Sequence, residues 1–145
     1  MDFKARYKTD KDAESEGVWE DIGEGFRVKV ARSNNPHHQR VAENLMRPYR
    51  RQIANGSLSN DKMTEITVKA MSEALLLDWE GLEIDDKPVP YSRETAHKLL
   101  TEYKDFREEV AELAQSIELF RSSEIEEAEK NSSSASSGKG SGKTT

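Results

Sequence analysis

The sequence contains no cysteine, and this absence excludes several kinds of chemistry. The chain cannot form a disulfide bond, present a thiolate nucleophile or bind a metal ion through sulfur. It also has no apolar run near the ~20 residues that a membrane-spanning helix needs. Its first sixteen residues, MDFKARYKTDKDAESE, are polar and of mixed charge, which is not the pattern of a secretory signal. We therefore expect a soluble intracellular protein.

Apolar side chains are scarce as well. Hydrophobic residues make up 34% of the 145 residues and charged residues another 34%, so the core must be modest. The last fifteen residues are mostly Ser, Gly and Lys and cannot bury apolar surface. We expect a flexible N-terminal segment (1–16), a hairpin plus helical domain (17–130) and a disordered Ser/Gly/Lys tail (131–145).

The net charge of −6 is unevenly distributed along the chain. Residues 26–51 contain seven basic side chains and one acid, whereas residues 52–131 contain nine basic and nineteen acidic side chains. Such an imbalance can steer a charged partner to the protein or let copies associate head to tail. A solvated surface without a partner is the alternative interpretation.

The pattern of residues 17–31 predicts a β-hairpin. Phe26, Val28 and Val30 alternate with basic side chains, and a Gly-Glu-Gly link precedes them. A two-stranded hairpin is only marginally stable alone. We expect it to lie on helices or to pair with another copy.

Helices are predicted for most of the rest. Asn35 and Pro36 form a helix start, and Pro48 should split that helix before it ends near Asn55. A second helix, from about Ser59 to an apolar end at residues 75–77, has the widest apolar face. Two more follow: one capped by Ser92, then one over residues 105–127, with a break at residues 101–105. The predicted fold is mainly α with a small N-terminal β-hairpin (α+β): a four- to five-helix bundle-like body with a disordered C-terminal tail.

Several possible sites have simpler explanations. His37 and His38 are neighbours on a helix, so their side chains diverge and cannot chelate one metal well. Asp85 and Asp86 have the wrong spacing for an EF-hand and fit a turn better. Residues 138–144, GKGSGKT, resemble a phosphate-binding loop, but the first glycine of that pattern is replaced by Ser137 and no strand precedes it. We therefore expect no enzyme activity, no cofactor and no metal site.

A basic run offers another possible function. Arg47, Arg50 and Arg51 flank Tyr49 and could contact nucleic acid, although the rest of the chain is strongly acidic. A nucleic-acid-binding or regulatory module is therefore an alternative to the interpretation that follows, although we expect no nucleic-acid partner.

Two stretches resemble the tail assembly chaperones of long-tailed bacteriophages. Residues 17–51, GVWEDIGEGFRVKVARSNNPHHQRVAENLMRPYRR, are similar to that family's opening, a hairpin that leads into an "ARxNNP" helix. Residues 75–100, LLLDWEGLEIDDKPVPYSRETAHKLL, are similar to its second motif, which is carried here by Asp78, Trp79, Gly81, Pro90, Tyr91, Ser92, Leu99 and Leu100. The resemblance covers about residues 17–120 and applies to the short, non-frameshifted form.

The resemblance implies a non-enzymatic protein of the infected host cytoplasm that is absent from the mature virion. Its implied partners are the phage tape-measure protein, which it keeps soluble, and the tail-tube protein, with self-association as a further option. It also implies a longer form made by translational frameshift, and we expect a slippery codon run at Gly138-Lys139 or Gly142-Lys143. A structural tail component that stays in the virion is another alternative.

A client helix would need spare apolar surface, and the groove between the second and last helices is the predicted place for it. Trp79, Leu82 and Tyr91, with two prolines nearby, are many large side chains for one loop; they either cap the helix ends or form part of a contact patch. The predicted protein-binding residues are Met71, Leu75, Trp79, Leu82, Tyr91, Phe106, Val110, Leu113, Ile117 and Phe120.

Overall fold

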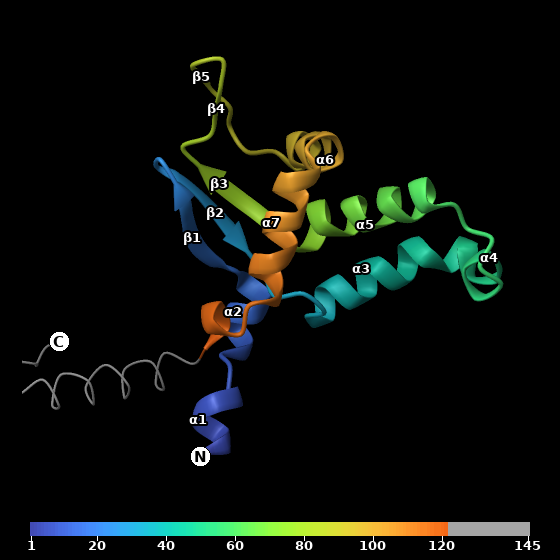
Figure 1. The fold of residues 1–145 in the computed structure, drawn as a ribbon, viewed down its shortest axis with the longest axis horizontal. Helices are drawn as coiled ribbons and strands as arrows, with labels where there is room; N and C mark the ends of the chain where they lie inside the picture. The colour runs from blue at the N-terminus through green and yellow to red at the C-terminus, as the bar shows by residue number, and fades with distance from the viewer. Residues whose placement is uncertain (122–145) are drawn as a thin grey trace, which may run out of the picture.

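A three-stranded antiparallel sheet organises the fold in the computed structural model, which describes residues 1–121 (Figure 1). Its strands, in spatial order, are β1 (Val18–Gly23), β2 (Phe26–Val30) and β3 (Leu76–Glu80). The central strand β2 places Val28 opposite both Glu20 of β1 and Trp79 of β3. A second small sheet, β4 (Glu83–Ile84) and β5 (Lys87–Pro88), follows β3 as a projecting hairpin.

The described residues form seven helices, of which the last three pack on one face of the sheet. They are α1 (Phe3–Tyr7), α2 (Lys11–Glu16), α3 (Pro36–Met46), α4 (Arg50–Ala54), α5 (Asn60–Ala74), α6 (Arg93–Glu102) and α7 (Lys104–Gln115), with 3-10 turns η1 (Arg47–Tyr49) and η2 (Glu118–Phe120). Val28 and Val30 of β2 are fully buried against apolar side chains of α5, α6 and α7. On the opposite face, Arg27 pairs with Glu80 at 2.8 Å and Lys29 lies opposite Asp78. The sheet therefore has one apolar and one polar face.

The prediction of a mainly helical, bundle-like body is wrong. The structure is a mixed α/β fold with two small sheets, and the N-terminal hairpin is part of a sheet with a third strand. That strand comes from residues predicted as a helix end: α5 stops at Ala74, and Leu76 begins β3. A short apolar run does not distinguish a helix end from a buried strand by periodicity. Pairing with β2 decides the outcome, because it buries Leu76 and Trp79 in the core.

The helix starts and breaks were predicted better than the fold. Asn35 caps α3 by accepting from the backbone N–H groups of His37 and His38, and Pro48 lies in the 3-10 turn that separates α3 from α4. Ser59 and Ser92 cap α5 and α6. α6 and α7 are separate helices, as the break at residues 101–105 predicted. Local capping chemistry is therefore readable where long-range pairing is not.

The two ends of the chain differ from the expectation in other ways. Residues 1–16 contain two short helices, and α7 ends at Gln115, earlier than predicted. η2 follows, and its Phe120 is fully buried. The remainder of the predicted last helix and the Ser/Gly/Lys tail lie outside the described residues.

Candidate functional site

An exposed apolar groove lies where the start of β2, the β3–β4 connection and the α6–α7 corner meet. Its volume is about 150 Å³, and six apolar or aromatic side chains line it: Phe26, Leu82, Ile84, Leu99, Tyr103 and Phe106. Ile84 is 43% exposed and Tyr103 is 50% exposed. A contiguous apolar surface of this kind, open to water, is typical of a binding site.

Two phenylalanines form one wall of the groove. Phe26 begins β2, and its ring centroid lies 6.1 Å from that of Phe106. Phe106 is in the first turn of α7, four residues before the fully buried Val110 and therefore on the same helix face. The wall is thus anchored by the core.

The opposite wall depends on a backbone contact between two turns. Gly81 has φ +78°, and a Cβ atom at this position would overlap the carbonyl oxygen of Gly25 in the β1–β2 turn. Glycine permits both the dihedral angle and the close approach. Next to it, the backbone N–H of Val89 donates to the carbonyl of Leu82 at 2.9 Å, which closes the base of the β4–β5 hairpin. Leu82 and Ile84 are thereby held beside Phe26.

The α6–α7 corner supplies the third side of the groove. Tyr103 lies between the two helices, and its backbone N–H donates to the carbonyl of Leu99 at 2.9 Å. The Arg107 Nη1 group donates to the carbonyl oxygens of Leu100 at 2.8 Å and Thr101 at 3.3 Å. A cation at the last carbonyls of a helix stabilises that end. Arg107 therefore helps to fix the corner that carries Leu99 and Tyr103.

Trp79 and Tyr91 of the 75–100 motif form hydrogen bonds that join the two segments flanking the β4–β5 hairpin. Trp79 Nε1 donates to the carbonyl of Val89, and the Tyr91 hydroxyl donates to the carbonyl of Leu76, both at 2.8 Å. The two rings meet edge to face, 4.9 Å apart between centroids. Burial raises the pKa of the Tyr91 hydroxyl, which remains a hydrogen-bond donor at neutral pH. These contacts hold the β4–β5 hairpin in place.

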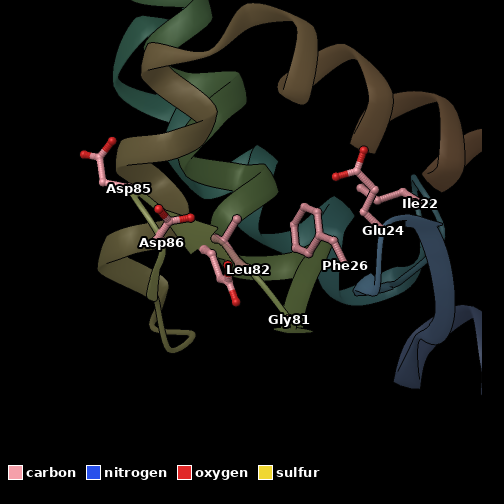
Figure 2. Close-up of a pocket in the computed structure, with 9 residues that line it drawn as sticks. Ile22, Glu24, Phe26, Gly81, Leu82, Asp85 and Asp86 are labelled. Atoms are coloured by element: carbon pink, nitrogen blue, oxygen red, sulfur yellow. The ribbon is translucent and has the colours of Figure 1, made fainter.

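A larger acidic opening adjoins the apolar groove. It has a volume of about 520 Å³ and is lined by Ile22, Gly23, Glu24, Phe26, Gly81, Leu82, Glu83, Asp85 and Asp86. Phe26 and Leu82 line both spaces. In Figure 2, Glu24 lies on one side, Asp85 and Asp86 on the other, and the two apolar side chains between them. The apolar groove therefore has an acidic border.

The turns of the two hairpins place these carboxylates. Asp85 and Asp86 have φ of +54° and +63°. A two-residue β-hairpin turn of type I′ requires positive φ at both positions, so the prediction of a turn is confirmed. Within residues 1–121, no ion pair involves Glu24, Glu83 or either aspartate. The same part of the chain contains no group of three His, Asp or Glu residues placed to hold a metal ion.

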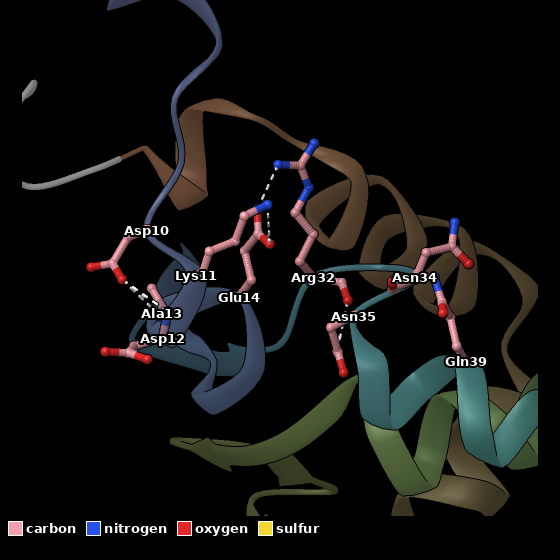
Figure 3. A network of polar contacts seen from close by, with 9 residues as sticks. All are labelled: Asp10, Lys11, Asp12, Ala13, Glu14, Arg32, Asn34, Asn35 and Gln39. Carbon is pink, nitrogen blue, oxygen red and sulfur yellow. Dashed lines mark hydrogen bonds and ion pairs between the residues drawn. The ribbon is translucent and has the colours of Figure 1, made fainter. Parts of the chain in front are cut away.

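Another polar cluster has a structural role instead (Figure 3). Glu14 of α2 accepts from Arg32 at 3.0 Å and pairs with Lys11 at 3.5 Å. Burial alone would raise the pKa of Glu14, but hydrogen bonds from Thr9 and Arg32 and the nearby positive charges lower it. The Arg32 backbone N–H also donates to the carbonyl of Glu14 at 2.8 Å. These contacts join α2 to the segment between β2 and α3.

The ten predicted binding residues fall into four environments. Met71, Leu75, Trp79, Val110 and Phe120 are buried. Tyr91 and Leu113 are partly buried beside the core, and Ile117 lies near α1. Only Leu82 and Phe106 line the apolar groove, which is beside the β4–β5 hairpin and not between α5 and α7. The role of all ten in binding stays a prediction.

Four groove residues were missing from that prediction: Phe26, Ile84, Leu99 and Tyr103. Phe26 was assigned to a strand and Leu99 to a helix, correctly, but neither pattern shows that the two elements meet. Ile84 gave the clearest sign of exposure. It alternates with Glu83 in an extended stretch that is too short to bury both Leu82 and Ile84. Tyr103 is a large aromatic residue in a predicted helix break, which also favours exposure.

The three arginines that could contact nucleic acid lie elsewhere, on the arm formed by α3, α4 and α5. This arm projects away from the sheet in Figure 1, with α4 at its tip. Arg47, Arg50 and Arg51 are exposed there, and the Lys62 ammonium lies 5.3 Å from the centre of the Tyr49 ring. The basic tip and the acidic hairpin therefore occupy different ends of the molecule.

Comparison with known proteins gives one family. The YdaY prophage protein family matches residues 33–131, which include the α3 start and the whole 75–100 motif. No curated protein and no solved structure matches the chain. None of the helices in residues 1–121 is long and apolar enough to cross a membrane.

Proposed function

This chain belongs to the YdaY prophage protein family and is of phage origin, and on that premise we propose that it is a tail assembly chaperone. It binds the tape-measure protein, keeps the apolar helices of that protein soluble and helps to recruit tail-tube subunits. It acts without catalysis in the cytoplasm of the infected bacterial host and is absent from the mature virion. The two motifs that resemble this class of chaperones support the proposal.

The apolar groove is the observation that carries the proposal. A chaperone of this kind needs a fixed apolar surface that stays open to solvent, and the groove has Ile84 and Tyr103 half exposed beside four partly buried side chains that pack against the core. An amphipathic helix can lay the apolar side chains of one face into such a groove.

The size of the groove suggests weak binding by each copy. Full burial of one large apolar side chain contributes about 1.5–3 kcal/mol, and much of this is offset by the cost of association. Several copies on one long client would bind through avidity. Weak single contacts also let the chaperone leave when tail-tube subunits arrive.

Co-expression tests the proposal. The tape-measure protein encoded by the same prophage is expressed with the wild-type chain, with Ile84→Ser, or with Phe3→Ser as the matched control. Phe3 is 69% exposed and lies in α1, outside the groove. We expect the wild-type chain and Phe3→Ser to raise the soluble fraction and to co-purify with the client, and Ile84→Ser to do neither. No solubilisation by the wild-type chain contradicts the proposal.

Two further tests address the life cycle. Purified virions are probed for the chain, and its presence there favours a structural tail component. The nucleotide sequence that encodes residues 138–143 is inspected for a slippery run, whose absence argues against a frameshifted longer form.

The basic arm supports a second candidate, a nucleic-acid-binding module. Arg47, Arg50 and Arg51 are exposed together at the tip. If this candidate is correct, charge reversal of the three arginines abolishes retardation of DNA in a gel. If the chaperone proposal is correct, the wild-type chain retards no DNA, and the reversed variant still solubilises the client.

A further inference from the structure

We infer that the occupant of the apolar groove is a basic amphipathic segment, with Lys or Arg within a turn or two of its apolar anchor side chains. The inference rests on the proposed function only in taking the occupant to be a client protein. The chemistry of the occupant follows from the groove and its border.

The first step is continuity between the two spaces. Phe26 and Leu82 line both the apolar groove and the acidic opening, so a chain seated against these two side chains has carboxylates beside it. Figure 2 shows Glu24, Asp85 and Asp86 around the two apolar residues. A segment that fills the groove therefore lies beside this border where it contacts Phe26 and Leu82.

The second step is the charge of the border. The stretch from Gly81 to Pro90 carries three acids, Glu83, Asp85 and Asp86, against one base, Lys87, and Glu24 adds a fourth acid from the facing turn. Arg27 does not offset them, because it is paired with Glu80 and stacked over the Trp19 ring at 4.8 Å. The border is therefore negative on the side of Phe26 and Leu82, where the groove meets the acidic opening.

The third step is the reach of these charges. At physiological salt the Debye length is about 8 Å, so exposed carboxylates select only groups that come close to them. One turn of a helix rises about 5.4 Å, which puts a basic residue one turn from an apolar anchor within this range, and the long Lys or Arg side chain extends the reach to a residue two turns away. An acidic residue at the same place would be repelled, which gives the site selectivity as well as affinity.

The groove itself takes only a short apolar anchor. Its volume of about 150 Å³ equals that of about five water molecules in the liquid, enough for one or two large side chains. Because the anchor is small, the neighbouring charges decide between apolar segments of similar hydrophobicity. This selection would direct the chaperone to those client helices whose apolar face is flanked by Lys or Arg.

A second copy of the chain is the competing occupant. The arm tip presents Tyr49 between Arg47, Arg50 and Arg51. An aromatic side chain flanked by basic ones is what the inferred occupant of the groove also has. We favour the client because Tyr49 is only partly exposed and lies under Lys62, so it is not free as an anchor. Self-association is measured as a separate outcome below.

The experiment uses the full chain and two labelled synthetic peptides of equal length that form amphipathic helices with the same apolar face. One peptide carries Lys beside that face and the other carries Gln at the same positions. Binding is measured by fluorescence anisotropy at low and at high salt. Because each exposed ion pair contributes a factor of about 1.5 to 5, two or three pairs give an expected preference of about 10-fold for the Lys peptide at low salt.

Three protein variants locate the effect. The triple variant Glu24→Gln, Asp85→Asn, Asp86→Asn should lose the preference and still bind both peptides weakly; Asn tolerates the positive φ of the hairpin turn. The control triple variant Glu108→Gln, Glu109→Gln, Glu112→Gln removes as many exposed carboxylates from α7 and should keep the preference. Ile84→Ser should lower the affinity for both peptides about 10-fold.

Equal binding of the two peptides, with both weakened by Ile84→Ser, overturns this inference and leaves the groove as the client site. Binding that Ile84→Ser does not change removes the groove from the proposed function as well. Sedimentation velocity of the unliganded chain covers the remaining case. If oligomers form and are lost both in the acidic triple variant and on charge reversal of the three arm arginines, the occupant is a second copy and the inference is wrong.

Discussion

Gly81 and Gly25 touch backbone to backbone, with no room for a side chain on Gly81. The contact joins the β1–β2 turn to the connection between β3 and β4. Residues next to these glycines, Phe26 and Leu82, line both the apolar groove and its acidic border. The geometry of the proposed binding site therefore depends on this one close approach.

Gly81→Ala should destabilise the protein by about 2–4 kcal/mol, because it combines a strained φ with displacement of the Gly25 backbone. Gly56→Ala is a matched control: its φ is +76°, close to that of Gly81, but a Cβ atom there meets nothing within 4 Å. It should cost about 1 kcal/mol, the strain alone. Urea unfolding followed by circular dichroism measures both, and equal losses would contradict the role of the contact.

Tyr91→Phe should lower the free energy of unfolding by about 1–2 kcal/mol, because the carbonyl of Leu76 loses its donor. Tyr103→Phe is the control, since no described hydrogen bond uses that hydroxyl, and it should be nearly neutral. Client affinity should change little in either variant, because Tyr91 does not line the groove and Tyr103→Phe keeps the aromatic ring that does. A large loss of affinity in Tyr91→Phe with unchanged stability would make Tyr91 a contact residue.

Glu14 should make the protein sensitive to acid. Its pKa in the folded state lies below the ordinary value of 4.5, so its stabilising contribution is complete above that value and is lost as the pH falls through the lowered pKa. Glu14→Gln should lower stability at pH 7 by about 1–3 kcal/mol and flatten the loss of stability below pH 5. Exposed Glu16→Gln serves as the control, and an unchanged acid profile in Glu14→Gln would refute the assignment.

His38 should titrate below its ordinary value of 6.5. Burial, and then the neighbouring charge of His37, lower its pKa, and its Nδ1 atom accepts from the backbone N–H of Asn34 at 3.0 Å. Since the unfolded state then binds the proton more readily, the free energy of unfolding should fall as the pH drops below 6.5. An NMR titration of the ring protons measures the midpoint directly, and a midpoint at or above 6.5 contradicts this arrangement.

Much of the local structure was predictable from the sequence, because it depends on neighbouring residues. Asn35, Ser59 and Ser92 are side chains that cap helices, and Pro48 cannot continue one. The alternation of Phe26, Val28 and Val30 likewise identified β2.

The sheet was not predictable in the same way. β3 pairs with β2 across more than forty residues, and nothing in residues 76–80 separates a strand from a helix end. The groove has the same origin, because its six side chains come from β2, β4, α6, α7 and two connections. The motif around Trp79 and Tyr91 was visible, but its aromatic rings proved to hold the hairpin that shapes the groove.

The central claim is that the groove at Phe26, Leu82 and Tyr103 holds the client, and one pair of variants tests it most directly. Tyr103 and Tyr7 are 50% and 49% exposed, but only Tyr103 lines the groove. Tyr103 also occupies the N-cap position of α7, where serine is favourable, so Tyr103→Ser should fold normally. The affinity of each variant for a soluble fragment of the tape-measure protein is measured by isothermal titration calorimetry. The account predicts at least a 10-fold loss for Tyr103→Ser and less than a 2-fold change for Tyr7→Ser; equal affinities in the two variants would contradict it.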